Sequence, residues 1–574
     1  MTAPASDPGS TPTWVADTEP NKRFTLYTRA NVGEVFPHVM TVLTGTLTGN
    51  AIRQGQVDVS VEMGVLRPHE AAGPSVGSGV FCGYVYLNAS AMRLFGERMP
   101  GISAVDADDQ VMGDVVGLPP YQRSRGDRNL LASLRLTWFA MQLLRQPDLA
   151  ALDRARTDAQ AWLAMMPDLH SGSDDELLRW LQTFPPRAGA SMKRLMQAGG
   201  AAGAPRGVLD RLLDRPDMPA GLANRIVSGT GDIDSAQLPR RLWLLGREVA
   251  RNELLTRAFD DGLEGIATRT RDTPLQAGID SFLADHGHRG NDEYELATPS
   301  WVMDPTPVYA AIDRLRHAAA DRDPVTAGKR LAADAESALA EALGLVPRPA
   351  RMIVRRAARV ARVGAACRER AKDILVLENL GARRVLHELA RRAHERGGPA
   401  DHRLVFCVTA TELADFVARP TEFANLIAQR ASQQRYLDDR VPPSWFVGSI
   451  PDPSTWAVRS ENRTSAPLTG TTLAGIAVSG GTATGRARVI SDPTDPQGLE
   501  AGDVLVCPLT DPSWTPLFLV AVAVVCETGA VQSHAAIISR ELGIPAVLSV
   551  PGITSVADGT VLHVDGFTGT VRVG

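Results

Sequence analysis

The C-terminal part of the chain alternates short apolar runs with glycine-bearing turns and one stretch of helical pattern. Residues 520–525 form a valine-rich run of strand length, and Gly529 ends it. From Ala535 the residues are mostly good helix formers, and Gly543 terminates that pattern. The pattern therefore predicts a strand, a glycine turn and a helix, with His534 at the N-terminus of the helix.

Apolar residues at helical spacing fill most of the chain before residue 449. The predicted helices lie at residues 149–166, 176–184, 242–259, 308–318 and 351–396. Glycine, proline and aspartate mark the loops between them, for example GGAAGAPRG at 199–207. Two polar stretches have no periodicity. Residues 1–20 are expected to be a disordered leader, and residues 449–470 are expected to be a linker.

The composition narrows the class of protein. A chain of 574 residues is long enough for about three domains. Its net charge of −5 gives no electrostatic reason to expect a nucleic acid or a membrane as partner. No stretch has the pattern of a signal peptide or a spanning helix. The five cysteines are scattered and odd in number, which argues against a disulfide framework or a zinc site. A cytoplasmic enzyme fits these observations.

His534 lies where a helix N-terminus presents free N–H groups, which favour an anion such as phosphate. The alternative is that His534 only caps the helix or fills a gap. The surrounding sequence TGAVQSHAAIISRELGIPAV resembles the phosphohistidine motif of the swivelling mobile domain of phosphoenolpyruvate-utilising enzymes. The segments GIAVSGGTATGRARVI, GDVLVCPLTDPSWTPLF and DGTVLHVDGFTGTVRV extend the resemblance in order and spacing. Ala530 departs from the family, which usually has a second glycine there.

The resemblance implies nucleophilic catalysis by an imidazole. His534 would take a phosphoryl group, hold it as a phosphoramidate and pass it to a second acceptor. Thr528, Gly529 and Ser533 would shape the turn that presents the histidine. The fold implied for residues 471–574 is an α/β swivelling phosphohistidine domain.

The region before the linker resembles the acceptor-binding domain of rifampicin phosphotransferase, and a similar region forms the histidine-bearing subunit of phenylphosphate synthase. The matching segments are TRANVGEVFPHVMTVLTG, YLNASAMRLFGERMPG and FLADHGHRGNDEYELATPSW. The expected fold class is therefore α-rich and multidomain. It has a mostly helical substrate-binding domain at 21–448, a hinge linker at 449–470 and the swivelling domain.

Two groups of charged residues could receive the phosphoryl group. HGHRGNDE brings His288, Arg289 and Glu293 together, as a general base beside a phosphate-clamping arginine would require. A solvated polar loop is the alternative. Arg368 and Lys372 are four residues apart and so share one helix face, where both could meet a phosphate. A charged outer helix face is the alternative, but the pair resembles an Arg and a Lys at the same spacing in rifampicin phosphotransferase.

Rifampicin phosphotransferase begins with an ATP-grasp domain, and no such domain or Walker A sequence is recognised here. The expectation is a phosphotransferase component that holds no metal. A separate ATP-grasp partner would charge His534, with ATP and Mg²⁺ bound by that partner. The acceptor would be a fairly large hydrophobic alcohol or phenol, activated for elimination or condensation in one variant. The alternative is a non-phosphorylating binding protein, or an enzyme of different chemistry, that retains the architecture.

Overall fold

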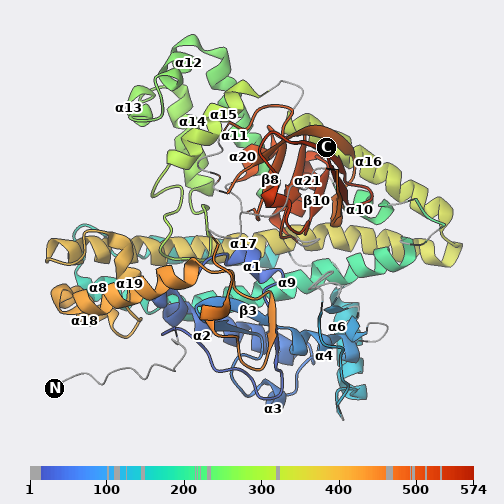
Figure 1. Cartoon of the computed structure of the whole chain (residues 1–574), viewed down its shortest axis with the longest axis horizontal. Helices are drawn as coiled ribbons and strands as arrows, with labels where there is room; N and C mark the ends of the chain where they lie inside the picture. The colour runs from blue at the N-terminus through green and yellow to red at the C-terminus, as the bar shows by residue number, and fades with distance from the viewer. Residues whose placement is uncertain are drawn as a thin grey trace.

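The computed structural model describes residues 14–574 except 100–102, 106, 109–116, 125, 144–148, 214, 216, 220, 229–233, 319–322, 460–469, 492, 494–497, 511–513 and 530–532. The long helix α17 (Arg348–Glu395) crosses the middle of the molecule, with α9 (Phe184–Leu213) packed along it (Figure 1). An N-terminal unit that contains α2 (Val42–Glu62) lies on one side of this pair, and the C-terminal α/β unit lies on the other.

The helices of the first 440 residues mostly follow the predicted pattern. The predicted helices at 149–166, 308–318 and 351–396 are confirmed as α7 (Leu149–Ala164), α15 (Thr306–His317) and α17. The others are α1 (Val32–Val35), α3 (Pro68–Ala71), α4 (Ala89–Arg98), α6 (Leu130–Leu143), α8 (Asp174–Leu181), α10 (Leu222–Val227), α11 (Asp234–Arg251), α12 (Glu253–Asp260), α13 (Ile266–Arg269), α14 (Pro274–His286), α16 (Pro324–Leu345), α18 (Leu413–Ala418) and α19 (Ala424–Asp438). None of the helices in the described ranges is long and apolar enough to cross a bilayer.

Three predictions for this region are wrong. The helix predicted at 176–184 is shorter, because α8 ends at Leu181 and Phe184 already begins α9. The helix predicted at 242–259 is divided into α11 and α12 at Asn252, because the Asn252 side chain accepts a hydrogen bond from the N–H of Leu254 at 3.0 Å and so caps a new helix. The loop predicted at 199–207 is instead the interior of α9. Its small residues let α9 approach α17, where a Cβ at Gly364 would lie 2.6 Å from the carbonyl oxygen of Ala201.

The N-terminal unit contains a four-stranded antiparallel sheet in the order β2-β3-β1-β4, which the helical pattern did not predict. Its strands are β1 (Leu26–Thr28), β2 (Ser78–Phe81), β3 (Tyr84–Asn88) and β4 (Trp445–Val447). Two segments expected to be irregular pack on this sheet. Trp14 is buried, and its ring N–H donates to the carbonyl oxygen of Met40 at 3.1 Å, so the disordered leader is wrong for residues 14–20.

Trp456 lies in the segment expected to be the hinge, and it is buried against Tyr84 with ring centroids 6.0 Å apart. Residues 449–459 therefore belong to the N-terminal unit. The rest of the expected hinge, except Gly470, lies outside the described residues, and the hinge stays a prediction.

The C-terminal unit is an eight-stranded mixed sheet in the order β5-β12-β11-β7-β8-β9-β10-β6. The central strands β7 to β10 run parallel, and the outer pairs are antiparallel. The strands are β5 (Thr472–Ala474), β6 (Ile476–Ser479), β7 (Thr482–Val489), β8 (Val504–Cys507), β9 (Ala523–Cys526), β10 (Ala546–Leu548), β11 (Val561–Asp565) and β12 (Thr570–Val573). The predicted strand and helix are confirmed as β9 and α21 (His534–Leu542), and the α/β character of the C-terminal domain is thereby confirmed.

The C-terminal unit packs against α11, α15 and α16 through apolar side chains. One buried cluster includes Leu242 of α11, Ile312 of α15, Phe518 of the short helix α20 (Thr515–Phe518) and Ile538 of α21. Because residues of both units share this cluster, the C-terminal unit is held against α11 and α15, on one side of α17 (Figure 1).

The close packing of α9 can be tested with two glycines of that one helix. A Cβ at Gly189 would lie 2.7 Å from the carbonyl oxygen of Ala51 in α2, whereas a Cβ at Gly199 meets nothing within 4 Å. We expect Gly189→Ala to destabilise the protein by about 1–3 kcal/mol. Gly199→Ala should stabilise it by about 0.5–1 kcal/mol, because alanine is the better helix former. Thermal unfolding measures both, and equal effects would contradict the packing described.

Candidate active site

His534 is the first residue of α21 and is partly buried. Ser533 caps the helix, since its side-chain oxygen accepts a hydrogen bond from the N–H of Ala536 at 3.3 Å. Two buried threonine hydroxyls bracket the imidazole. Thr510 Oγ1 lies 3.1 Å from Nδ1 of His534, and Thr515 Oγ1 lies 3.4 Å from Nε2. A hydroxyl can donate or accept, so the pair orients the ring whichever nitrogen carries the proton.

The turn before His534 is held by its backbone. The N–H of Thr528 donates to the carbonyl oxygen of Pro508 at 2.9 Å. Gly529 is required for space, because a Cβ there would lie 2.8 Å from the Leu548 side chain. Residue 530, where the chain departs from the family pattern, lies outside the described residues together with 531 and 532.

Positive charges of the helical region act on His534. Lys372 comes from α17, and Arg289 comes from the segment that follows α14. Burial lowers the pKa of His534 well below its ordinary value of 6.5, and the charges of Lys372 and Arg289 lower it further. The imidazole is therefore neutral at neutral pH, the form that acts as a nucleophile.

A buried carboxylate holds these two cations in place. Glu293 lies 2.8 Å from the Lys372 ammonium and 3.2 Å from the Arg289 guanidinium. Burial alone would raise the pKa of Glu293, but Arg289 and then Lys372 outweigh burial and lower it. Burial would lower the pKa values of Lys372 and Arg289, but Glu293 together with other nearby acidic groups outweighs burial and raises both. All three groups are ionised, as a buried ion cluster requires.

His288 forms a second buried pair near this cluster. Its Nε2 lies 2.7 Å from the carboxylate of Asp373, and the Asp373 carboxylate also meets the Arg156 guanidinium at 3.0 Å. Burial would raise the pKa of Asp373, but His288 and the nearby arginines hold it well below its usual range. The HGHRGNDE segment is therefore not a solvated polar loop, because His288, Arg289 and Glu293 are all buried.

Arg368 lies one helical turn before Lys372 on α17. Its charge acts on Tyr294 and on Arg540 of α21, so it lies within electrostatic range of both residues. The sequence-predicted residues His534, Arg289, Glu293 and Lys372 are thus brought together, with Arg368 at their edge.

Two residues of this region were missed by the sequence analysis. Asp373 directly follows Lys372, but only the fold shows that it faces His288. Glu34 lies in α1, and its charge acts on Cys526 at the end of β9, just before the turn that presents His534. The only sequence signal for Glu34 was its place inside TRANVGEVFP. Among the described residues, no three His, Cys, Asp or Glu side chains are arranged to hold a metal ion.

Two family models match the regions of the chain that contribute to this site. Residues 190–369 match the fourth domain of rifampicin phosphotransferase, and residues 499–569 match the mobile domain of PEP-utilising enzymes. The first match contains Arg289 and Arg368, and the second contains His534.

Three curated relatives illustrate the similarity. Rifampicin phosphotransferase of Streptomyces sviceus is 31% identical over 320 residues, which cover 55% of this chain and 36% of that protein. The prodigiosin-synthesising transferase PigC of Serratia marcescens is 29% identical over 368 residues, 62% of this chain and 40% of PigC. The uncharacterised phosphotransferase YvkC of Bacillus subtilis is 48% identical over 100 residues, 17% of this chain and 12% of YvkC.

In each case the aligned part is less than half of the relative's length. Three findings point to the same kind of protein: the match to a mobile domain, the histidine at a helix N-terminus within it, and the match in the helical region. The chain therefore contains a region similar to the mobile domain of PEP-utilising enzymes and a region similar to the fourth domain of rifampicin phosphotransferase.

Proposed function

We propose that this chain is a phosphotransferase component in which His534 carries a phosphoryl group to a hydroxyl of an organic acceptor. The observation that supports this most directly is the position of His534. A neutral imidazole at a helix N-terminus meets the charges of Lys372 and Arg289 from a different unit of the protein. A phosphoryl group on His534 would lie in that positive field.

Each residue has a role in the proposed transfer. The acceptor oxygen attacks phosphorus as the P–N bond to His534 breaks, and the electron pair of that bond returns to the imidazole. Lys372 and Arg289 stabilise the charge on the phosphoryl oxygens in transit, and Glu293 keeps both cations in place. The proton of the acceptor hydroxyl passes to His288, whose ring Asp373 holds in place through the 2.7 Å contact. Arg368, four residues before Lys372, would add a further positive charge.

The donor and the acceptor are inferred from chemistry and from the relatives. A separate ATP-grasp protein, using ATP and Mg²⁺, would phosphorylate His534. The acceptor would be a hydrophobic alcohol or phenol. The name of PigC, a synthesising transferase, favours the variant in which phosphorylation activates the hydroxyl for a later condensation.

The carrier role can be tested without a partner protein. We expect phosphoramidate, a chemical phosphoryl donor, to add one phosphoryl group to His534, detected by intact-mass and tandem mass spectrometry. The label should be lost in acid and survive base, as phosphoramidates do. His534→Ala should lose it while the fold is kept. His563→Ala, a control in the same domain, should keep it. Labelling of the His534→Ala protein at the wild-type level would exclude the carrier role.

The electrostatic contact can be tested through the pH dependence of His534. Diethyl pyrocarbonate reacts with neutral imidazole, so its rate at His534 should fall only at pH values well below 6.5. Lys372→Met removes one cause of the lowered pKa and should move the midpoint upward, toward 6.5. Arg370→Met, on the same helix but paired with Asp153, should leave the midpoint unchanged. The same midpoint in all three proteins would mean that Lys372 does not act on His534.

The role of Asp373 can be separated from that of His534 by measuring two half-reactions. We expect Asp373→Asn to slow transfer from phosphorylated His534 to 1-naphthol by about 10²–10⁴-fold, the usual contribution of a general base. Uptake of the phosphoryl group from phosphoramidate should be unchanged. Arg156→Met removes the outer partner of Asp373 but keeps the His288 pair, and should retain most of the transfer.

Because Asp373 is buried, its loss can destabilise the protein by about 3–5 kcal/mol. The assays are therefore run well below the measured midpoint of thermal unfolding. Unchanged transfer in a folded Asp373→Asn protein would rule out the proposed role of the His288–Asp373 pair.

A further inference from the structure

A large cavity lies in the N-terminal unit, apart from the site around His534. Its volume is about 970 Å³, at the upper end of the range of small-molecule sites. The helix α2 forms its floor, and α2 packs on α9, which in turn packs on α17. The C-terminal unit lies on the other side of α9 and α17 (Figure 1). The cavity is therefore separated from His534 by two layers of helix.

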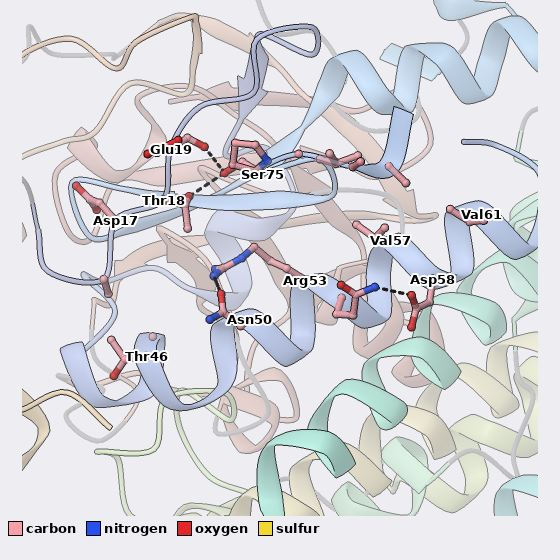
Figure 2. A pocket seen from close by; sticks show the side chains of 18 of the residues that line it. Asp17, Thr18, Glu19, Thr46, Asn50, Arg53, Val57, Asp58, Val61 and Ser75 are labelled. Atoms are coloured by element: carbon pink, nitrogen blue, oxygen red, sulfur yellow. Dashed lines mark hydrogen bonds between the residues drawn. The ribbon is translucent and has the colours of Figure 1, made fainter. Parts of the chain in front are cut away.

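One face of α2 lines the cavity at helical spacing. Thr46, Asn50, Arg53, Val57 and Val61 follow one another along this face (Figure 2). Facing them, the opposite wall consists of residues 15–19 and 68–76. The lining divides into two parts. Asn50 and Arg53 make one end polar, and at the other end the apolar side chains of Val57 and Val61 lie beside Asp58 and Glu62.

Most of the acidic side chains around the cavity are already engaged. Asp58 accepts a hydrogen bond from the Gln54 amide at 2.6 Å, and Glu62 forms an ion pair with Lys193 of α9. The Asp17 carboxylate accepts hydrogen bonds from the backbone N–H groups of Gly83 at 2.9 Å and Trp14 at 3.0 Å. The remaining carboxylate, Glu19, is exposed at the rim.

Arg53 is the arginine that lines the cavity, and its hydrogen-bond partner is neutral. Its guanidinium lies back over Gly49 and donates a hydrogen bond to the neutral side-chain carbonyl of Asn50 (Figure 2). Within the described ranges, Arg53 forms no ion pair with any carboxylate. Burial lowers the pKa of Arg53, and no neighbouring carboxylate offsets that effect. An arginine nevertheless stays charged in proteins, so the polar end of the cavity holds a partly desolvated cation whose neighbour is neutral.

We propose that this cavity binds an amphipathic organic anion, with its carboxylate or sulfonate at Arg53 and Asn50 and its apolar body over Val57 and Val61. The guanidinium gives the anionic group a charge-assisted hydrogen bond. The valines on α2, with Ala71 and Val76 opposite, remove the apolar body from water. This site is independent of the proposed phosphoryl transfer, because none of its residues belongs to the site of His534.

The probe for this site is 8-anilinonaphthalene-1-sulfonate, an amphipathic anion that fluoresces in apolar surroundings. We expect one saturable site on the full chain. Arg53→Met should weaken binding by about 10- to 100-fold, the value of a hydrogen bond to a charged group. Arg53→Lys should recover part of the affinity because it restores the charge. Arg403→Met, a matched loss of an exposed arginine elsewhere, should bind like the wild type.

Displacement of the probe by competing ligands shows whether the cavity binds an anion or a cation more tightly. Decanoate should displace the probe, and decyltrimethylammonium, with the same chain and the opposite charge, should not. Phosphoryl uptake by His534 should be unchanged in Arg53→Met, which also shows that the variant is folded. Equal probe affinity in the wild-type and Arg53→Met proteins would overturn the proposal. Preferential displacement by the cation would overturn it in favour of an acidic site.

Discussion

A carboxylate removed from water must be paired, and this requirement determines how the centre of the molecule is built. Glu293 is nearly inaccessible, and Arg289 and Lys372 neutralise it from two different chain segments. The backbone of the same segment is satisfied by α17. The Asn379 amide donates to the carbonyl oxygen of Glu293 at 3.0 Å, and Arg383 donates to that of Asp292 at 2.9 Å. The segment and the helix therefore pack in one register, and in that register the charge of Lys372 acts on His534.

Local signals allowed part of this arrangement to be predicted from the sequence. The strand and helix around His534 are specified within about 25 residues by valines, glycines and a serine cap, and the structure has both as expected. The four-residue spacing of Arg368 and Lys372 correctly predicted one helix face. The pairing of His288 with Asp373 was not predictable, because its partners are 85 positions apart and no periodicity relates them.

Small residues produced the clearest error. Glycine, alanine and proline at 199–207 are typical of a loop, yet they lie in the interior of α9. Their intrinsic cost to a helix is outweighed by the close approach to α17, which larger residues would prevent. The four-stranded sheet was missed for a related reason. Its strand β4 joins β1 from more than 400 residues away, and short strands of three residues carry little pattern.

The apolar contact between the C-terminal unit and α11 and α15 has a thermodynamic consequence. Separating the two units would expose Leu242, Ile312 and Phe518 to water. Exposed apolar surface has a large positive heat capacity and, near room temperature, an entropic cost. The association of the C-terminal unit with α11 and α15 should therefore be strengthened by moderate warming and weakened by cooling. The fraction of molecules in which the histidine faces α17 would then depend on temperature as well as on the chemistry at His534.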